Sequence, residues 1–144
     1  MSFGRPSDFT VEKGAEICAR IVDGASLRTI CSSEDMPDVR TVYRWLAINE
    51  DFRHQYALAR EDQADTLADE IIDIADDSKH DIMIVTNPDG SEREVENREV
   101  VNRSRLRVDA RKWVASKLKP KKYGDAMIHK GDETSPISVK INLG

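Results

Sequence analysis

The sequence lacks three features that would each point to a large class of proteins. No apolar run approaches the roughly 18–20 residues that a membrane-spanning helix needs. Residues 1–10 contain no apolar segment of the kind found in secretory signal peptides. The phosphate-binding pattern Gly-x-x-x-x-Gly-Lys-Ser/Thr is also missing. These absences predict a cytosolic protein that does not bind a membrane and is not itself an ATP-driven motor.

Residues that bind metals or form disulfides are scarce. Cys18 and Cys31 both fall among apolar residues of predicted helices, which favours reduced thiols that serve as small core side chains. His54, His80 and His129 are scattered without the spacing of metal ligands. Asp and Glu are plentiful, but no apolar pocket pattern surrounds them. The sequence therefore predicts no metal site, no cofactor and no catalytic residue.

Charge is distributed very unevenly along the chain. The net charge of −5 hides an acidic region, residues 50–97, with 4 basic and 15 acidic residues, or −11. Residues 98–130 contain 11 basic and 3 acidic residues, or +8. Such a dipolar arrangement suits two helices that lie against each other, within one subunit or between subunits. The net charge consequently gives no information about binding to DNA.

Residues 1–49 have the pattern of a small helical domain. Ser7-Asp8 or Thr10 caps a predicted helix that runs from Val11 to Asp23, and Gly24 ends it. A short helix is predicted over 27–31 after Ser26, and a third over 39–48 after Asp38. Three helices with a tight turn between the second and the third follow the helix-turn-helix plan.

The predicted third helix has the features of a DNA recognition helix. Its outward residues are polar or basic near the N-terminus, where they reach base edges in the major groove. Its inward residues, Val42 and Trp45 among them, are apolar. The alternative is that Arg40 and Arg44 only keep an exposed helix soluble. Arg5, in a short arm before the first helix, is a candidate for the minor groove. The full set of predicted DNA-binding residues is Arg5, Arg28, Asp38, Arg40, Thr41, Tyr43 and Arg44.

Two long helices and a hairpin are predicted next. Apolar residues recur in steps of three and four from Phe52 to about Asp77, which predicts a long amphipathic helix. The segment 81–96 reads as two strands around the turn Asn87-Pro88-Asp89-Gly90. Because a two-stranded hairpin is only marginally stable alone, we expect it to pack against another element. Residues 98–118 are predicted to be helical, and Pro120 to end that helix.

The last segment, 137–143, alternates strictly between apolar and polar residues, as a half-buried strand does. It has no obvious partner strand, so we expect it to pair with another chain or with the hairpin. The basic segment 98–122 leaves two alternatives open. It grips DNA phosphates, or it pairs with the acidic helix over 61–77, and the number of aspartates on that helix favours pairing.

Two blocks of sequence resemble a known family. The first contains Gly4-Arg5-Pro6-Ser7-Asp8, Met36-Pro37-Asp38, Thr41-Val42-Tyr43-Arg44-Trp45-Leu46 and Glu50-Asp51-Phe52-Arg53. The second is the more specific and contains Ser104-Arg105-Leu106-Arg107-Val108-Asp109-Ala110-Arg111-Lys112-Trp113, followed by Lys119-Pro120-Lys121-Lys122-Tyr123-Gly124-Asp125. Over residues 4 to about 126, the chain resembles the small terminase subunits of tailed double-stranded DNA bacteriophages. The segment 81–96 departs from the shorter members of that family.

The resemblance implies a function without catalysis, in the host cytoplasm. The chain would recognise the packaging initiation site on double-stranded viral DNA, assemble as a ring of eight to eleven subunits, and recruit or regulate the large ATPase/nuclease subunit. One rival hypothesis is a dimeric helix-turn-helix transcription regulator. Another is a resolvase-like enzyme, which would need a catalytic domain that the chain lacks room for. The mass in solution discriminates between the ring and the dimer.

The expected fold class is mainly α, in three parts. These are a helix-turn-helix domain over 1–49, a helical oligomerisation domain over 50–125 with a β-hairpin insertion at about 81–96, and a tail over 126–144. The tail's strand, 137–143, would join an intersubunit barrel. The residues expected in oligomerisation are Phe52, Tyr56, Leu67, Ile71, Ile74, Trp113, Ile137, Val139, Ile141 and Leu143.

Overall fold

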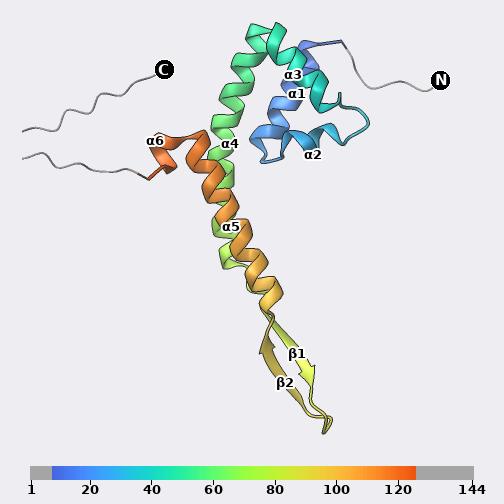
Figure 1. Ribbon diagram of the computed structural model, residues 1–144, viewed down its shortest axis with the longest axis vertical. Coiled ribbons are helices and arrows are strands. Elements are labelled where there is room, and N and C mark those ends of the chain that lie inside the picture. Colours follow the sequence, from blue (N-terminus) through green and yellow to red (C-terminus); the bar gives the residue numbers. More distant parts are fainter. Residues whose placement is uncertain (1–7, 126–144) are drawn as a thin grey trace, which may run out of the picture.

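The computed structural model describes residues 8–125, which form six helices and a two-stranded sheet. Three short helices, α1 (Val11–Val22), α2 (Leu27–Cys31) and α3 (Val39–Ile48), gather at one end of the elongated molecule (Figure 1). The long helix α4 (Glu50–Asp76) leaves them, and α5 (Arg98–Leu118) returns beside it. The strands β1 (Ile82–Thr86) and β2 (Glu92–Glu96) project from the opposite end, and the short α6 (Pro120–Tyr123) follows α5. The chain is thus mainly helical, as the sequence predicts.

Each of the first three helices begins at a side chain that accepts a backbone hydrogen bond. Thr10 accepts from the Lys13 amide at 3.1 Å, Ser26 from the Thr29 amide at 3.2 Å, and Asp38 from a third amide at 2.8 Å. These bonds satisfy amides that have no partner inside the helix. Helix α1 ends before Gly24, whose φ of 104° is a conformation that glycine adopts without strain. The local signals read from the sequence therefore place these helices within a residue of their observed bounds.

An apolar core holds the short helices and the beginning of α4 together. Phe9 contributes a ring 5.4 Å from that of Trp45 and 5.2 Å from that of Phe52. A side chain at Gly14 would collide with the rings of Phe9 and Phe52, so this position requires the small residue. The fully buried residues of the core come from four helices and from the turn between α2 and α3: Ile17, Ile21, Ile30, Met36, Val42, Trp45 and Phe52. The first half of α4 therefore packs as a fourth helix of the N-terminal unit.

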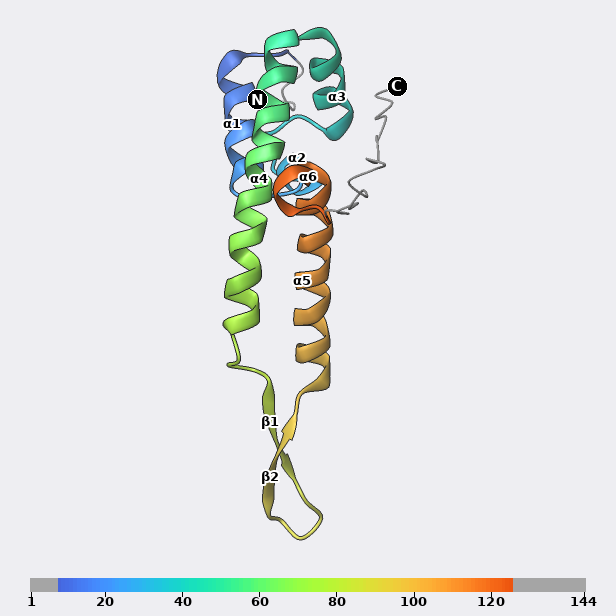
Figure 2. The same cartoon turned by 90° about the vertical axis from the view of Figure 1, so that its left-hand side faces the viewer.

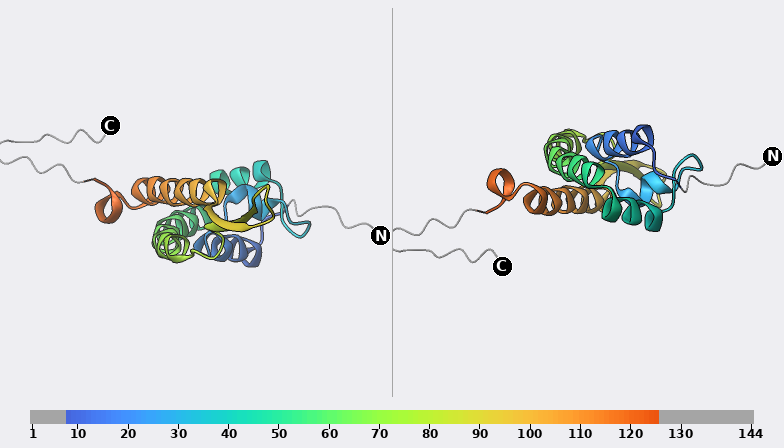
Figure 3. Two further views of the ribbon diagram at one scale, coloured as in Figure 1. Left: turned by 90° about the horizontal axis from the view of Figure 1, so that it is seen from below. Right: turned by 90° about the horizontal axis from the view of Figure 1, so that it is seen from above.

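The second half of α4 packs against α5. The two helices run side by side in opposite directions (Figure 2), and an end-on view places α1 and α5 against different sides of α4 (Figure 3). Leu67, Ile74 and Ala115 are buried here. The Gln63 amide donates to the Ala25 carbonyl at 2.9 Å and the Thr66 hydroxyl to the Val22 carbonyl at 2.7 Å, which fixes α4 against the end of α1.

The β-hairpin has the turn and the strands that the sequence predicts, but not the expected packing. Its antiparallel register pairs Ile82 with Glu96 and Thr86 with Glu92, and Gly90 takes a φ of 86° in the turn. We expected the hairpin to pack against another element, and within the described residues no helix supplies that contact. Neither strand contacts a helix of the chain, because the hairpin extends past the ends of α4 and α5 (Figure 1).

Two further differences concern the end of the chain. The sequence pattern treats Pro120 only as the end of a helix, whereas Pro120 also begins α6. Proline suits a first helical position because the amide that it lacks would have no partner there. The predicted strand over 137–143, with Ile137, Val139, Ile141 and Leu143, lies outside the described residues, as does Arg5.

Candidate nucleic-acid interface

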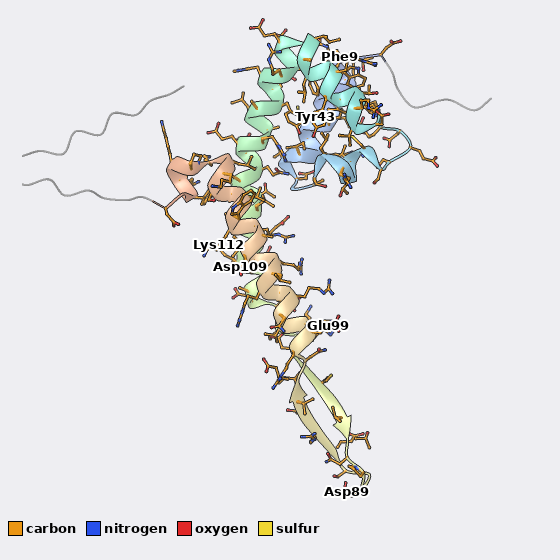
Figure 4. The ribbon with its side chains drawn as sticks, in the orientation of Figure 1. Phe9, Tyr43, Asp89, Glu99, Asp109 and Lys112 are labelled. Atoms are coloured by element: carbon orange, nitrogen blue, oxygen red, sulfur yellow. The ribbon has the colours of Figure 1, made fainter. Side chains whose placement is uncertain are left out.

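Helix α3 is held by its apolar side and presents a polar side to solvent. Val42 and Trp45 are fully buried in the core. Arg40, Tyr43 and Arg44, at spacings of three and four residues, are exposed on one face. Figure 4 labels Tyr43 on this helix. Arginine can bond guanine with two hydrogen bonds and can also bind phosphate, so this face has the chemistry of a DNA-reading surface.

Two of the predicted DNA-binding residues belong to the structure of the helix itself. The Asp38 carboxylate caps α3 by accepting the Thr41 amide at 2.8 Å. The Thr41 side chain is half-buried, whereas Arg40 beside it is exposed. Asp38 therefore sets where α3 begins, and with it the direction in which the arginines point.

Arg28 comes from α2 and joins the same surface. It lines a shallow hollow together with Ser32, Asp38 and Arg40. The turn between α2 and α3 thus brings two of the predicted basic residues, Arg28 and Arg40, to one place. Arg44 and Tyr43 continue the surface one turn further along α3.

A network of charged residues holds that turn against α1, and the sequence reasoning missed it. The Arg20 guanidinium contacts Glu16 at 2.9 Å and Asp35 at 3.2 Å. The Lys13 ammonium donates to the Asp35 backbone carbonyl at 2.9 Å. Each ion pair is partly exposed and so contributes little alone, but together they fix the segment that precedes α3. The spacing of four residues between Glu16 and Arg20 was the one signal in the sequence.

The acidic and basic halves of the chain meet along α4 and α5, as the charge distribution predicts. The Arg111 Nε lies 2.7 Å from the Glu70 Oε2. Asp65 receives three donors from the region of α6: the Tyr123 hydroxyl at 2.6 Å, Lys122 Nζ at 2.9 Å and Lys119 Nζ at 3.0 Å. Part of the basic segment therefore pairs with the acidic helix inside one subunit.

The donors around Asp65 change its acid–base properties. The hydrogen bond from Tyr123, followed by those from Lys122 and Lys119, holds the pKa of Asp65 well below its usual range. The same carboxylate raises the pKa of Tyr123 and the pKa of Lys122. All these effects favour the charged carboxylate with its neutral and cationic donors, so α6 is tied to α4 at neutral pH.

The outer faces of α4 and α5 keep charges that no ion pair within the described residues uses. On α4 these are aspartates beside the exposed Leu58 and Ile72: Asp62, Asp69 and Asp76. Asp73 instead lines a groove with Arg103 and Arg107 of α5. On α5 the exposed Leu106 and Trp113 lie among charged residues that are mostly basic: Arg105, Asp109, Lys112 and Lys117. Figure 4 labels Lys112 on α5.

The predicted oligomerisation residues have different surroundings. Phe52 is 1% exposed and lies in the core of its own chain, with Tyr56 half-buried beside it. Leu67 and Ile74 are buried on α4, and Ile71 is half-buried. Trp113, which helical spacing more often places in a core, is 64% exposed. It borders a groove that Ala68, Ile71 and Tyr123 also line.

Other kinds of site find no support between residues 8 and 125. No group of three or more His, Cys, Asp or Glu side chains in that range is placed to hold a metal ion. No helix there is long and apolar enough to cross a membrane. Burial raises the pKa of Cys18 and so disfavours the reactive thiolate.

The family model and the solved structures that match this chain belong to the same family of proteins. Residues 9–130 match the family described as bacteriophage Sf6 terminase small subunit-like. Crystal structures of the terminase small subunit gp1 of the bacterial virus Sf6, each carrying a different mutation, are similar to this chain. Two are 37% identical and a third is 36% identical; each has a TM-score of 0.69 over 95% of both chains. A search of curated protein sequences finds no match.

Proposed function

This chain belongs to the family of terminase small subunits similar to that of bacteriophage Sf6, and from that premise we propose how it takes part in packaging viral DNA. A helix-turn-helix unit formed by α1–α3 recognises the packaging initiation site on double-stranded DNA. The long helices assemble copies of the chain into a ring. The ring recruits or regulates the large subunit, and this chain carries no catalysis of its own.

The observation that carries the DNA-binding proposal is the exposed basic face of α3. Arg40 and Arg44 are exposed on α3, and Trp45 anchors the opposite side of this helix in the apolar core. Acidic residues nearby have other partners, since Glu16 and Asp35 are paired with Arg20. Residues 1–49 contain 6 basic and 7 acidic residues, so these pairs leave the exposed face of α3 more basic than that balance suggests. A recognition helix that enters the major groove requires such a rigid and basic outer face.

The test is a pair of double variants in the full chain. Arg40→Ala with Arg44→Ala should weaken binding to the packaging-site DNA, because each lost base or phosphate contact costs on the order of 1–3 kcal/mol. Many copies in a ring multiply that loss. Arg105→Ala with Arg107→Ala, which removes the same charge from α5, should leave binding nearly unchanged when both variants are compared as assembled rings. The reverse result would move the DNA site to α5.

Assembly into a ring is supported by the different character of the two outer faces. The outer face of α4 is acidic around Leu58 and Ile72, and that of α5 is basic around Leu106 and Trp113. A two-fold dimer formed through either outer face alone would bring like faces together, acid against acid or base against base. A head-to-tail contact brings unlike faces together and, when it closes, produces a ring. This observation favours the ring over a dimeric transcription regulator.

Native mass spectrometry of the purified chain tests assembly directly. We expect a closed species of eight to eleven copies, and a dimer at micromolar concentration would contradict the proposal. For recruitment, we propose that the tail beyond residue 125 docks on the large subunit. A chain that ends at residue 135 should bind DNA normally and capture the large subunit poorly in a pull-down experiment.

A further inference from the structure

The β-hairpin is the part of the described chain with the least cover. Its strands contact only each other, and it extends beyond the ends of α4 and α5 (Figure 2). Ile82 is 59% exposed, Ile84 is 66% exposed, and Met83 beside them is also exposed. A two-stranded hairpin alone in water is marginally stable. An exposed and apolar strand edge invites pairing with another strand.

The composition of the two strands differs sharply. β1 carries no charge (Ile82-Met83-Ile84-Val85-Thr86), whereas β2 alternates charge (Glu92-Arg93-Glu94-Val95-Glu96). The register places Ile84 opposite Glu94, so the three glutamates form one row beside the row of isoleucines. Met83, Val85 and Val95 lie together on the other face, with Arg93 opposite Val85. Exposed strand edges are usually protected by lysine, proline or a bulge. The open edge of β1 has none of these.

The backbone groups that face the open edges can be identified from the bonds at both ends of the ladder. The Asn97 amide donates to the Asp81 carbonyl at 2.7 Å, and the Asn87 amide to the Ser91 carbonyl at 2.7 Å. Bonded and non-bonded pairs alternate along an antiparallel ladder. The backbone groups of Ile82, Ile84 and Thr86 therefore point outward from β1, and those of Glu92, Glu94 and Glu96 point outward from β2.

We propose that these edges pair between copies of this chain, with β1 of one copy against β2 of the next. Charge decides this arrangement. Pairing β2 with β2 would place rows of glutamates side by side, and like charges directly opposite are destabilising. Pairing β1 with β2 separates successive glutamate rows by a row of isoleucines, about 9–10 Å apart at two strand spacings. The strands alternate in direction throughout, and both edges of every hairpin are used.

The helices bring the correct strands together, and in this respect the inference rests on the proposed head-to-tail assembly. β1 continues from α4 and β2 leads into α5 (Figure 1). A copy whose α5 packs on the α4 of its neighbour consequently carries its β2 next to the neighbour's β1. Around a closed ring, the hairpins join into one sheet without free edges, and the face opposite the isoleucines carries Met83, Val85 and Val95 together with Arg93.

Hydrogen–deuterium exchange on the assembled full-length chain tests the pairing without a substitution. The amides of Ile82, Ile84, Glu92 and Glu94 should exchange at least roughly tenfold more slowly than open edge amides, because they open only with local unfolding. Protection on β1 alone would indicate a two-fold pairing of β1 strands and would overturn the proposal. If the protection disappears when residues 136–144 are removed, the partner of the open edge is the C-terminal segment. That result would also overturn the proposal.

Ile84→Pro supplies a second, independent measurement. It removes an outward amide and leaves the bonds inside the hairpin intact, since proline is tolerated where the amide faces away from the ladder. We expect the β2 edge amides to lose their protection and the ring to loosen. Ile84→Val, which keeps the amide and an apolar side chain, should behave as the parent chain. If the parent is assembled but its edge amides exchange fast, the inference fails while the ring stands. A parent chain that is a monomer in solution would contradict both the pairing of the hairpins and the proposed ring.

Discussion

The N-terminal unit and the arm formed by the second half of α4, α5 and the hairpin are built on opposite principles. The N-terminal unit buries its large apolar side chains, such as Trp45 and Phe52, inside one chain. The arm exposes several of its own, including Ile72, Leu106 and Trp113. One region is therefore complete as a single copy, whereas the other has the surface of an element that becomes complete in an assembly.

The two tryptophans provide the sharpest test of this difference, and Trp45 should show the largest effect. Trp45→Ala removes a ring that is 1% exposed and in contact with Phe9. The loss of a buried aromatic side chain costs about 3–5 kcal/mol. We expect the N-terminal unit to unfold at a much lower urea concentration, followed by circular dichroism, and DNA binding to fail with it. An unchanged midpoint would contradict the role of the core.

Trp113→Ala should affect assembly and leave the fold of the subunit intact. The ring is 64% exposed, and only the Lys117 ammonium lies over it, 5.6 Å from its centre. Interface tryptophans often contribute about 2 kcal/mol or more, which corresponds to roughly a thirtyfold loss of affinity per contact. Sedimentation should detect smaller species, with helix content preserved. If assembly is unaffected, the outer face of α5 is not the contact.

Charge reversal tests the complementarity of the outer faces, with a smaller effect. One variant carries Asp69→Lys and Asp76→Lys on α4, and the other carries Arg105→Glu and Lys112→Glu on α5. Exposed ion pairs are worth up to about 1 kcal/mol each, so each variant alone should assemble less well at low salt. An equal mixture should recover, because the reversed α4 of one variant then meets the reversed α5 of the other. Mixing without recovery would rule out a head-to-tail contact between these faces.

The smallest effect concerns Asp65, which holds α6 to the arm. Its pKa is lowered, so its contribution is complete above the ordinary aspartate range and is lost only as the pH falls well below that range. The pKa of Tyr123 is raised, so its contribution persists below the ordinary tyrosine pKa and is lost as the pH rises past the raised value. In Asp65→Asn, NMR of labelled tyrosine should show Tyr123 ionising at a lower pH than in the parent, with Tyr43 as the internal control.

The elements that the sequence predicts well are those set by neighbours in the chain. Ser26 and Asp38 place α2 and α3 through hydrogen bonds three residues away. Asn87 to Gly90 set the hairpin turn by the conformations that proline and glycine prefer. Arg40 and Arg44 were identified because helical spacing puts them on the face opposite Val42. Such signals act over a few residues and need no knowledge of the rest of the fold.

Contacts between distant residues were decided only by the tertiary structure. Arg20 meets Asp35, and Tyr123 meets Asp65 across 58 positions, and no local pattern specifies either pair. Trp45 and Trp113 both lie on apolar stripes of helices, yet one is buried and the other faces outward. The sequence by itself determined the helices, the hairpin and the separation of charge, because these depend on spacing and composition. Only the packing of α4 between α1 and α5 determined which apolar faces are already covered, because burial depends on what each face meets in space.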